Sequence, residues 1–67
     1  MQKGVIKMFD TFKGFGFIVT EDGDDVYFSL QDIMPKYRKI PPREGRSVGF
    51  DLKREMKGDR AVNIRFL

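Results

Sequence analysis

Residues 13–18 of the 67-residue chain read Lys-Gly-Phe-Gly-Phe-Ile, and the orientation of this stretch decides how the sheet is built. Alternation at period two is typical of a β-strand with one buried and one exposed face. Turning Ile18 inward also turns Gly16 inward and leaves Phe15 and Phe17 outside. The reverse orientation buries both phenylalanines and exposes Ile18, and for this strand alone the burial tendency of aromatic residues favours it.

The next alternating stretch, residues 25–30 (DVYFSL), resolves this choice. Burying Tyr27 there exposes both Val26 and Phe28, whereas burying those two exposes only Tyr27 among the large residues. We therefore predict that Tyr27 shares an exposed face with Phe15 and Phe17. The predicted core then has eleven members: Ile6, Phe9, Ile18, Val26, Phe28, Ile33, Val48, Phe50, Leu52, Val62 and Ile64.

Similar short runs recur along the chain between turn residues and predict an all-β protein. The Asp-Gly pair at 22–23 suits a tight hairpin, and residues 57–59 (Lys-Gly-Asp) are a second turn candidate. Three prolines make residues 31–46 a long connection, because proline cannot donate to a sheet ladder. This pattern fits one domain, residues 1–67, folded as a five-stranded antiparallel OB-fold barrel of Greek-key type. The strands are expected at about 3–10, 15–20, 25–30, 47–54 and 60–66.

The composition limits the chemistry available to the chain. There is no cysteine and no histidine, so a disulfide scaffold and the commonest transition-metal ligands are absent. Ser29 and Ser47 are the only serines, and the acidic run from Asp22 to Asp25 lacks the closing glutamate of a calcium loop. We therefore expect a protein that is not an enzyme and that binds no metal and no cofactor.

The same composition bears on location. No apolar run approaches the roughly 20 residues of a membrane span, and charge interrupts the N-terminal stretch too early for a signal peptide. These features predict a soluble, cytoplasmic protein without a membrane partner.

Charge is divided unevenly between the two halves of the chain. Residues 1–33 carry three lysines against six acidic residues, a formal charge of −3, whereas residues 34–67 carry ten basic against four acidic residues, a charge of +6. A solvated surface accounts for such charge, but polyanions are natural partners for the second half.

Near the exposed aromatics, Lys7 and Lys13 add positive charge. Flat rings beside cations suit single-stranded nucleic acid, whose bases stack at about 1–3 kcal/mol each while basic side chains contact phosphates.

Several segments resemble the cold-shock protein family. Residues 13–18 (KGFGFI) and 25–30 (DVYFSL) resemble its two ribonucleoprotein-type motifs, residues 4–10 (GVIKMFD) its first strand and residues 61–64 (AVNI) its last. The resemblance implies a five-stranded OB barrel that binds single-stranded RNA or DNA with little sequence preference, as RNA chaperones of cold adaptation do. It implies nucleic-acid contacts at the matching lysines and aromatics, which are Lys7, Lys13, Phe15, Phe17, Tyr27 and, in the long connection, Tyr37.

At three positions the chain lacks the residue that the family usually has, so its aromatic surface is smaller than the family pattern implies. Met8 stands where the family usually has a stacking tryptophan, Ser29 where it has histidine, and Leu30 where it has phenylalanine. Met8 either contacts a base through its thioether or packs at the rim. Each lost stack removes about 1–3 kcal/mol, so we expect compensation from charge in the long connection, at Lys36, Arg38, Lys39 and Arg43. Phe12 either extends the aromatic surface or plugs the space beneath its loop.

A different class of function uses the same surface. Keeping the apolar residues Met8, Leu30 and Val5 while losing tryptophan and histidine is also what a protein-interaction or self-associating module would do. Nucleic-acid binding predicts strong salt dependence from counterion release, and an apolar protein interface predicts little. We expect a monomer, with a dimer as the alternative, and single-stranded RNA or DNA as the partner.

Overall fold

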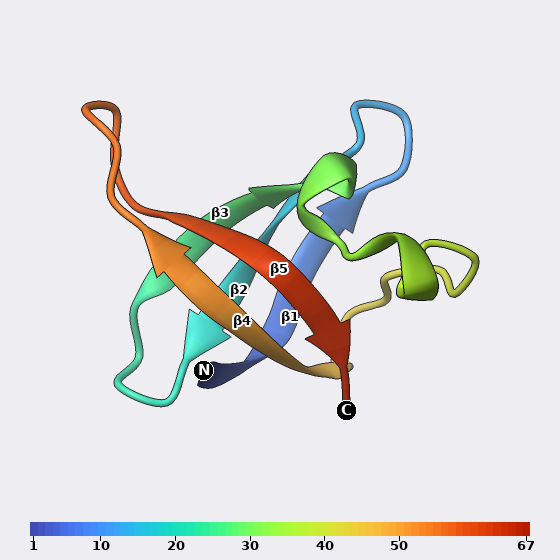
Figure 1. Cartoon of the computed structure of the whole chain (residues 1–67), viewed down its shortest axis with the longest axis horizontal. Helices are drawn as coiled ribbons and strands as arrows, with labels where there is room; N and C mark the ends of the chain where they lie inside the picture. The colour runs from blue at the N-terminus through green and yellow to red at the C-terminus, as the bar shows by residue number, and fades with distance from the viewer.

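Five strands and two short 3₁₀ turns make up the computed structural model, which describes all 67 residues (Figure 1). Each predicted strand is present within two residues of its expected bounds. The only helical segments are three residues long, and no helix of the chain could cross a membrane. The elements in order are β1 (Gln2–Asp10), β2 (Phe15–Thr20), β3 (Asp25–Ser29), η1 (Leu30–Asp32), η2 (Pro35–Tyr37), β4 (Ser47–Lys53) and β5 (Arg60–Phe66).

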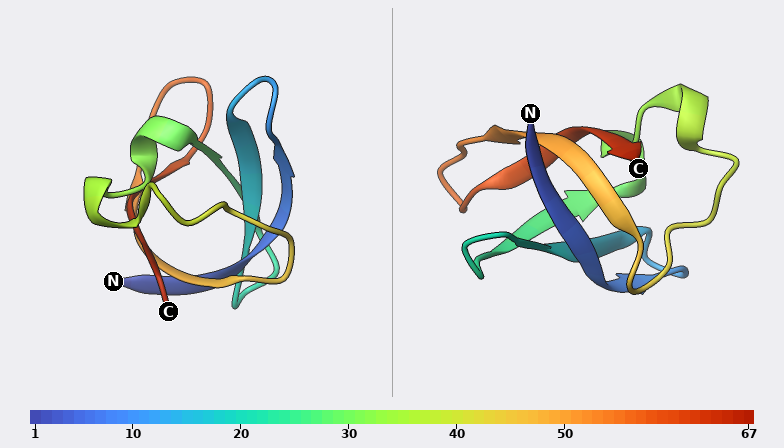
Figure 2. Two further views of the ribbon diagram at one scale, coloured as in Figure 1. Left: turned by 90° about the vertical axis from the view of Figure 1, so that its right-hand side faces the viewer. Right: turned by 90° about the horizontal axis from the view of Figure 1, so that it is seen from below.

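The strands close into a barrel in the order β1-β2-β3-β5-β4, with β4 paired back to β1. Figure 2 shows them curving around a common centre from two further directions. This arrangement confirms the predicted five-stranded OB-type barrel. Four of the strand pairs are antiparallel, but β3 and β5 run parallel and meet at Tyr27 and Arg60. The expectation of a wholly antiparallel barrel missed this parallel contact, because the long connection brings β5, not β4, alongside β3.

The interior confirms the orientation chosen for β2 and β3. Ile18 and Phe28 are completely buried, Val26 is 4% exposed, and Phe15 and Phe17 lie on the outer side of β2. Gly16 is buried as well, and a Cβ at this position would collide with the carbonyl oxygen of Met8 and the ring of Phe28. The close approach of β1 and β2 therefore requires glycine. The core residues are Ile6, Ile18, Val26, Phe28, Ile33, Val48, Phe50, Ala61, Ile64 and Phe66.

A β-bulge in β5 explains one difference between the observed core and the predicted one. Between β4 and β5 the register shifts at Asn63, which has a positive φ of 52°. The extra residue reverses the alternation, so that Ala61 is buried and Val62, predicted as core, is only half-buried. Phe9 and Leu52 also prove to be partly buried residues that pack against the core.

Replacing Ile18 by alanine tests the orientation of β2. Because Ile18 is fully buried, we expect Ile18→Ala to lower the free energy of unfolding by about 2–5 kcal/mol, measured by urea unfolding followed by circular dichroism. The control is Phe12→Ala, since Phe12 is fully exposed, and its effect should stay within about 0.5 kcal/mol. Similar losses in the two variants would contradict the buried position of Ile18.

Candidate nucleic-acid interface

Phe15, Phe17 and Tyr27 form a compact group of rings on the outer side of β2 and β3, which we call the aromatic cluster. Phe17 and Tyr27 are direct neighbours in the β2–β3 register. The rings of Phe15 and Tyr27 stack with centroids 5.8 Å apart and planes 24° from parallel. Phe17 meets each of them edge-on, at 6.1 Å. The sequence-predicted aromatic residues of the two strands therefore lie together on one surface.

The bulge in β1 brings two more of the predicted site residues to this side of the barrel. The register with β2 shifts between Ile6 and Met8, so Met8 lies opposite Phe17 and is half-buried. Lys7, the extra residue, reaches over to β3, where its Nζ is 3.0 Å from Oδ2 of Asp25. Lys7 therefore reaches Asp25 at the start of β3, and its charge is paired within the protein.

The turn between β1 and β2 presents Phe12 and Lys13 to solvent. Oδ1 of Asp10 accepts hydrogen bonds from the backbone N–H groups of Phe12, at 2.9 Å, and Lys13, at 3.1 Å. Gly14 completes the turn with a φ of 70°, which suits glycine. Phe12 is fully exposed, so the interpretation that it plugs the space beneath the loop is wrong. The turn carries an aromatic side chain and a free cation at the end of β2 where the cluster lies.

A hydrogen-bonded network lies next to the cluster, at the end of β3. Oδ2 of Asp32 accepts from the backbone N–H of Ser29 at 2.8 Å and from its hydroxyl at 3.2 Å. The same oxygen accepts from Nε of Arg60 at 2.9 Å, and Nη2 of Arg60 donates to the Ser29 hydroxyl at 3.1 Å. Ser29, a predicted site residue, is therefore held inside the network. Leu30 follows it and is 43% exposed.

Arg60 is the residue of this surface that the sequence did not indicate. Its guanidinium carbon lies over the Tyr27 ring, 5.6 Å from the centroid. The hydrogen bond to Asp32 raises the pKa of Arg60, and burial opposes this rise only in part. Asp32 and Arg60 are 28 residues apart in sequence. Only the closure of the barrel brings them together, so no local pattern could have found the pair.

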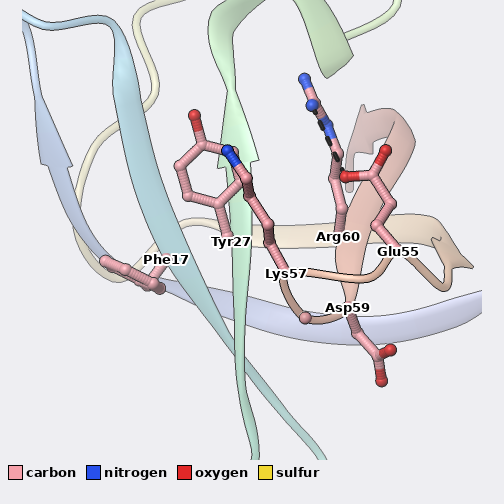
Figure 3. A pocket seen from close by; sticks show the side chains of 7 residues that line it. Phe17, Tyr27, Glu55, Lys57, Asp59 and Arg60 are labelled. Carbon is pink, nitrogen blue, oxygen red and sulfur yellow. Dashed lines mark ion pairs between the residues drawn. The ribbon is translucent and has the colours of Figure 1, made fainter.

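A hollow of about 490 Å³ lies between the aromatic cluster and the loop that joins β4 to β5. Figure 3 shows Phe17 and Tyr27 on one side of it and Arg60 on the other, with Lys57 from the loop between them. Its remaining lining residues are Glu55, Gly58 and Asp59. The hollow extends the aromatic surface beyond β3 and gives it polar walls of both charges.

The predicted site residues of the long connection have different surroundings. Tyr37 packs against Phe66, with ring centroids 5.9 Å apart, and so covers the core instead of joining the aromatic cluster. Arg38 donates from Nε to the carbonyl of Ile33 and from Nη2 to that of Gln31, both at 3.0 Å. Its guanidinium therefore holds the connection in shape. Lys39 is exposed and makes no ion pair.

Comparison with known proteins agrees with this architecture. Residues 2–67 match the model of the 'Cold-shock' DNA-binding domain family. The chain is 42% identical to the major cold shock protein of Streptococcus pyogenes over 64 residues, covering 96% of this chain and 94% of that protein. It is 38% identical to the cold shock protein CspC of Bacillus subtilis over 65 residues, covering 97% of each. A cold shock-like protein CspC of Bacillus cereus is 40% identical over 63 residues, which is 92% of this chain and 94% of that one.

The family match spans nearly the whole chain, and the barrel, the two aromatic strands and the relatives agree. The chain belongs to the cold-shock domain family, as its resemblance in sequence predicted. Nucleic-acid binding is the general function of that family. No group of three or more acidic, histidine or cysteine side chains is arranged to hold a metal ion.

Substituting Asp32 tests the hydrogen-bonded network of Ser29, Asp32 and Arg60. Asp32→Ala leaves Arg60 and the Ser29 N–H without their shared acceptor, so we expect the free energy of unfolding to fall by about 1.5–3 kcal/mol. Asp25→Ala is the matched control, because it removes an exposed carboxylate from an ion pair with Lys7 and should cost less than about 1 kcal/mol. Urea unfolding of both variants measures the difference. Equal losses would mean that Asp32 does not hold the network together.

Proposed function

We propose that this protein binds single-stranded RNA or DNA with low sequence specificity through the aromatic cluster and the cations around it, as an RNA chaperone does. The main support is that Phe15, Phe17 and Tyr27 pack into one outward-facing group. Exposed rings offer every base a stacking surface, so binding of this kind tolerates any sequence. The proposal makes the protein a monomeric, cytoplasmic binding module without enzymatic activity.

The cations that would contact phosphates lie on several elements. Lys13 projects from the β1–β2 turn, Lys57 from the β4–β5 loop and Lys39 from the long connection, and all three are exposed. None of the three forms an ion pair within the protein. Free lysines of this kind release counterions when they meet a phosphate backbone. Lys7 and Arg38 are poorer candidates, because their charged groups already have protein partners.

The residues that depart from the family pattern have limited roles in this proposal. Met8 adds a half-buried thioether beside Phe17, and Leu30 adds an exposed apolar edge. The Ser29 hydroxyl is engaged by Asp32 and Arg60. Phe12, on its exposed turn, offers one further ring to a base. Base stacking therefore falls mainly on Phe15, Phe17 and Tyr27, with a larger share of the affinity left to charge.

Titration with short oligonucleotides tests the proposal directly. The chain has no tryptophan, so its fluorescence comes from Tyr27 and Tyr37, and stacking on Tyr27 should quench it, more weakly at high salt. Phe17→Ala should weaken binding by roughly 5- to 150-fold, the loss of one stack, while Met56→Ala, at a fully exposed loop position, should change nothing. If a labelled oligonucleotide shows no anisotropy change at high micromolar protein in low salt, the proposal fails, and a protein-interaction module becomes the better explanation.

The contribution of the long connection is tested by a charge reversal. Lys39→Glu should reduce the affinity and lower the slope of log affinity against log salt by about one, as expected for one lost phosphate contact. The control is Lys3→Glu, an exposed lysine at the start of β1 with the same change in net charge. Anisotropy titrations over a range of salt concentrations give both slopes. Equal effects of the two reversals would show that only net charge matters.

A further inference from the structure

The hollow beside Tyr27 contains a donor group and an acceptor group next to each other. Arg60 and Glu55 both line it, and Nη1 of Arg60 lies 3.9 Å from Oε1 of Glu55. Figure 3 shows the two side chains extending in the same direction, whereas Asp59 points the opposite way. Stacking on the aromatic rings does not require such a pair. Its presence suggests that this part of the surface reads a hydrogen-bonding pattern.

The donor group is fixed in place by the protein. Nε of Arg60 donates to Asp32 at 2.9 Å and Nη2 donates to Ser29 at 3.1 Å, which uses one edge of the guanidinium fork. The other edge consists of Nη1 and the second N–H of Nη2. The only ion-pair contact of Nη1 is the one to Glu55 at 3.9 Å, which is too long for a hydrogen bond. Arg60 therefore holds two adjacent donors ready for a ligand.

The acceptor group is similarly free. The Glu55 carboxylate contacts Lys53 at 3.8 Å and Arg60 at 3.9 Å, and it accepts no close hydrogen bond from either. Its side chain is 38% exposed. Both carboxylate oxygens are thus able to accept hydrogen bonds from a group that enters the hollow.

We propose that the hollow is a subsite that prefers guanine over the other bases when the protein binds a single strand; the inference rests on the proposed function. Guanine presents two adjacent acceptors, O6 and N7, which match the free edge of an arginine. It also presents two adjacent donors, N1–H and the N2 amino group, which match a carboxylate. The two edges of the base meet at O6, so neighbouring side chains can engage them together. None of the other three bases presents both pairs.

Stacking places the base where these groups can reach it. The Arg60 guanidinium lies over the Tyr27 ring at 5.6 Å, and Phe17 and Tyr27 form the apolar wall of the same hollow. A base against that wall has its polar edge toward Arg60 and Glu55. A phosphate fits the part of the hollow beside the Arg60 guanidinium less well, because the Glu55 carboxylate lies there and would repel it.

The test compares hexathymidylate with the same strand carrying one internal guanine, each labelled with fluorescein and bound to the full chain. A short strand can shift its register to place the guanine, and a single guanine per strand disfavours guanine-quartet assembly. We expect the guanine strand to bind about tenfold more tightly, the discrimination typical of one good base contact. Replacing guanine by inosine, which lacks the N2 amino group, or by 7-deazaguanine, which lacks N7, should each remove much of this preference.

Two variants assign the preference to Glu55. Glu55→Gln and Asp59→Asn each remove one negative charge from the same hollow, so both should raise affinity for all strands to a similar degree. Only Glu55→Gln should reduce the ratio of guanine to thymine affinity, because of these two carboxylates only that of Glu55 lies near the Arg60 guanidinium. Arg60 itself is unsuitable for substitution, since it also anchors Asp32.

The outcomes separate this inference from the proposed function. Equal affinity for the two strands, or a guanine preference that survives Glu55→Gln, overturns the guanine subsite while leaving single-strand binding intact. Failure of every strand to bind overturns both. A preference that falls with inosine, with 7-deazaguanine and with Glu55→Gln supports the subsite as described.

Discussion

The packing of β1 onto β2 at Gly16 is the constraint on which the rest of the structure depends. A side chain at this position would collide with the backbone of β1 and with Phe28, so the two strands can approach only at glycine. With Gly16 inside, Ile18 is inside as well and Phe15 and Phe17 are outside. The residues that fill the small core therefore determine which residues face outward, and the aromatic surface is a consequence of core packing.

This dependence explains why the aromatic cluster was predictable from sequence. Period-two alternation has only two solutions for each strand, and Val26 with Phe28 excluded one of them. The barrel and the outward Phe15, Phe17 and Tyr27 follow from that choice. Val62 was placed wrongly because a β-bulge at Asn63 adds one residue and reverses the alternation. A bulge of this kind leaves little trace in a hydrophobic pattern.

The parts of the candidate site that escaped prediction all depend on contacts distant in sequence. Arg60 reaches Tyr27 and Asp32 only after the barrel closes. The role of Arg38 as a clamp on the carbonyls of Gln31 and Ile33 likewise depends on the shape of the connection. Sequence reasoning identified both halves of the chain as relevant, one for its rings and one for its charge. It could not tell which basic residues are free and which are already engaged.

The parallel contact between β3 and β5 joins the Tyr27 and Arg60 positions of the barrel wall. Arg60 is tied to Asp32 and Ser29 at the same place. Because a substitution at any one of Ser29, Asp32 and Arg60 leaves a donor or acceptor without its partner, these positions are free to diverge only as a set. Among related chains, these three residues at the contact of β3 and β5 are therefore expected to be substituted together, whereas the exposed lysines can be substituted one at a time.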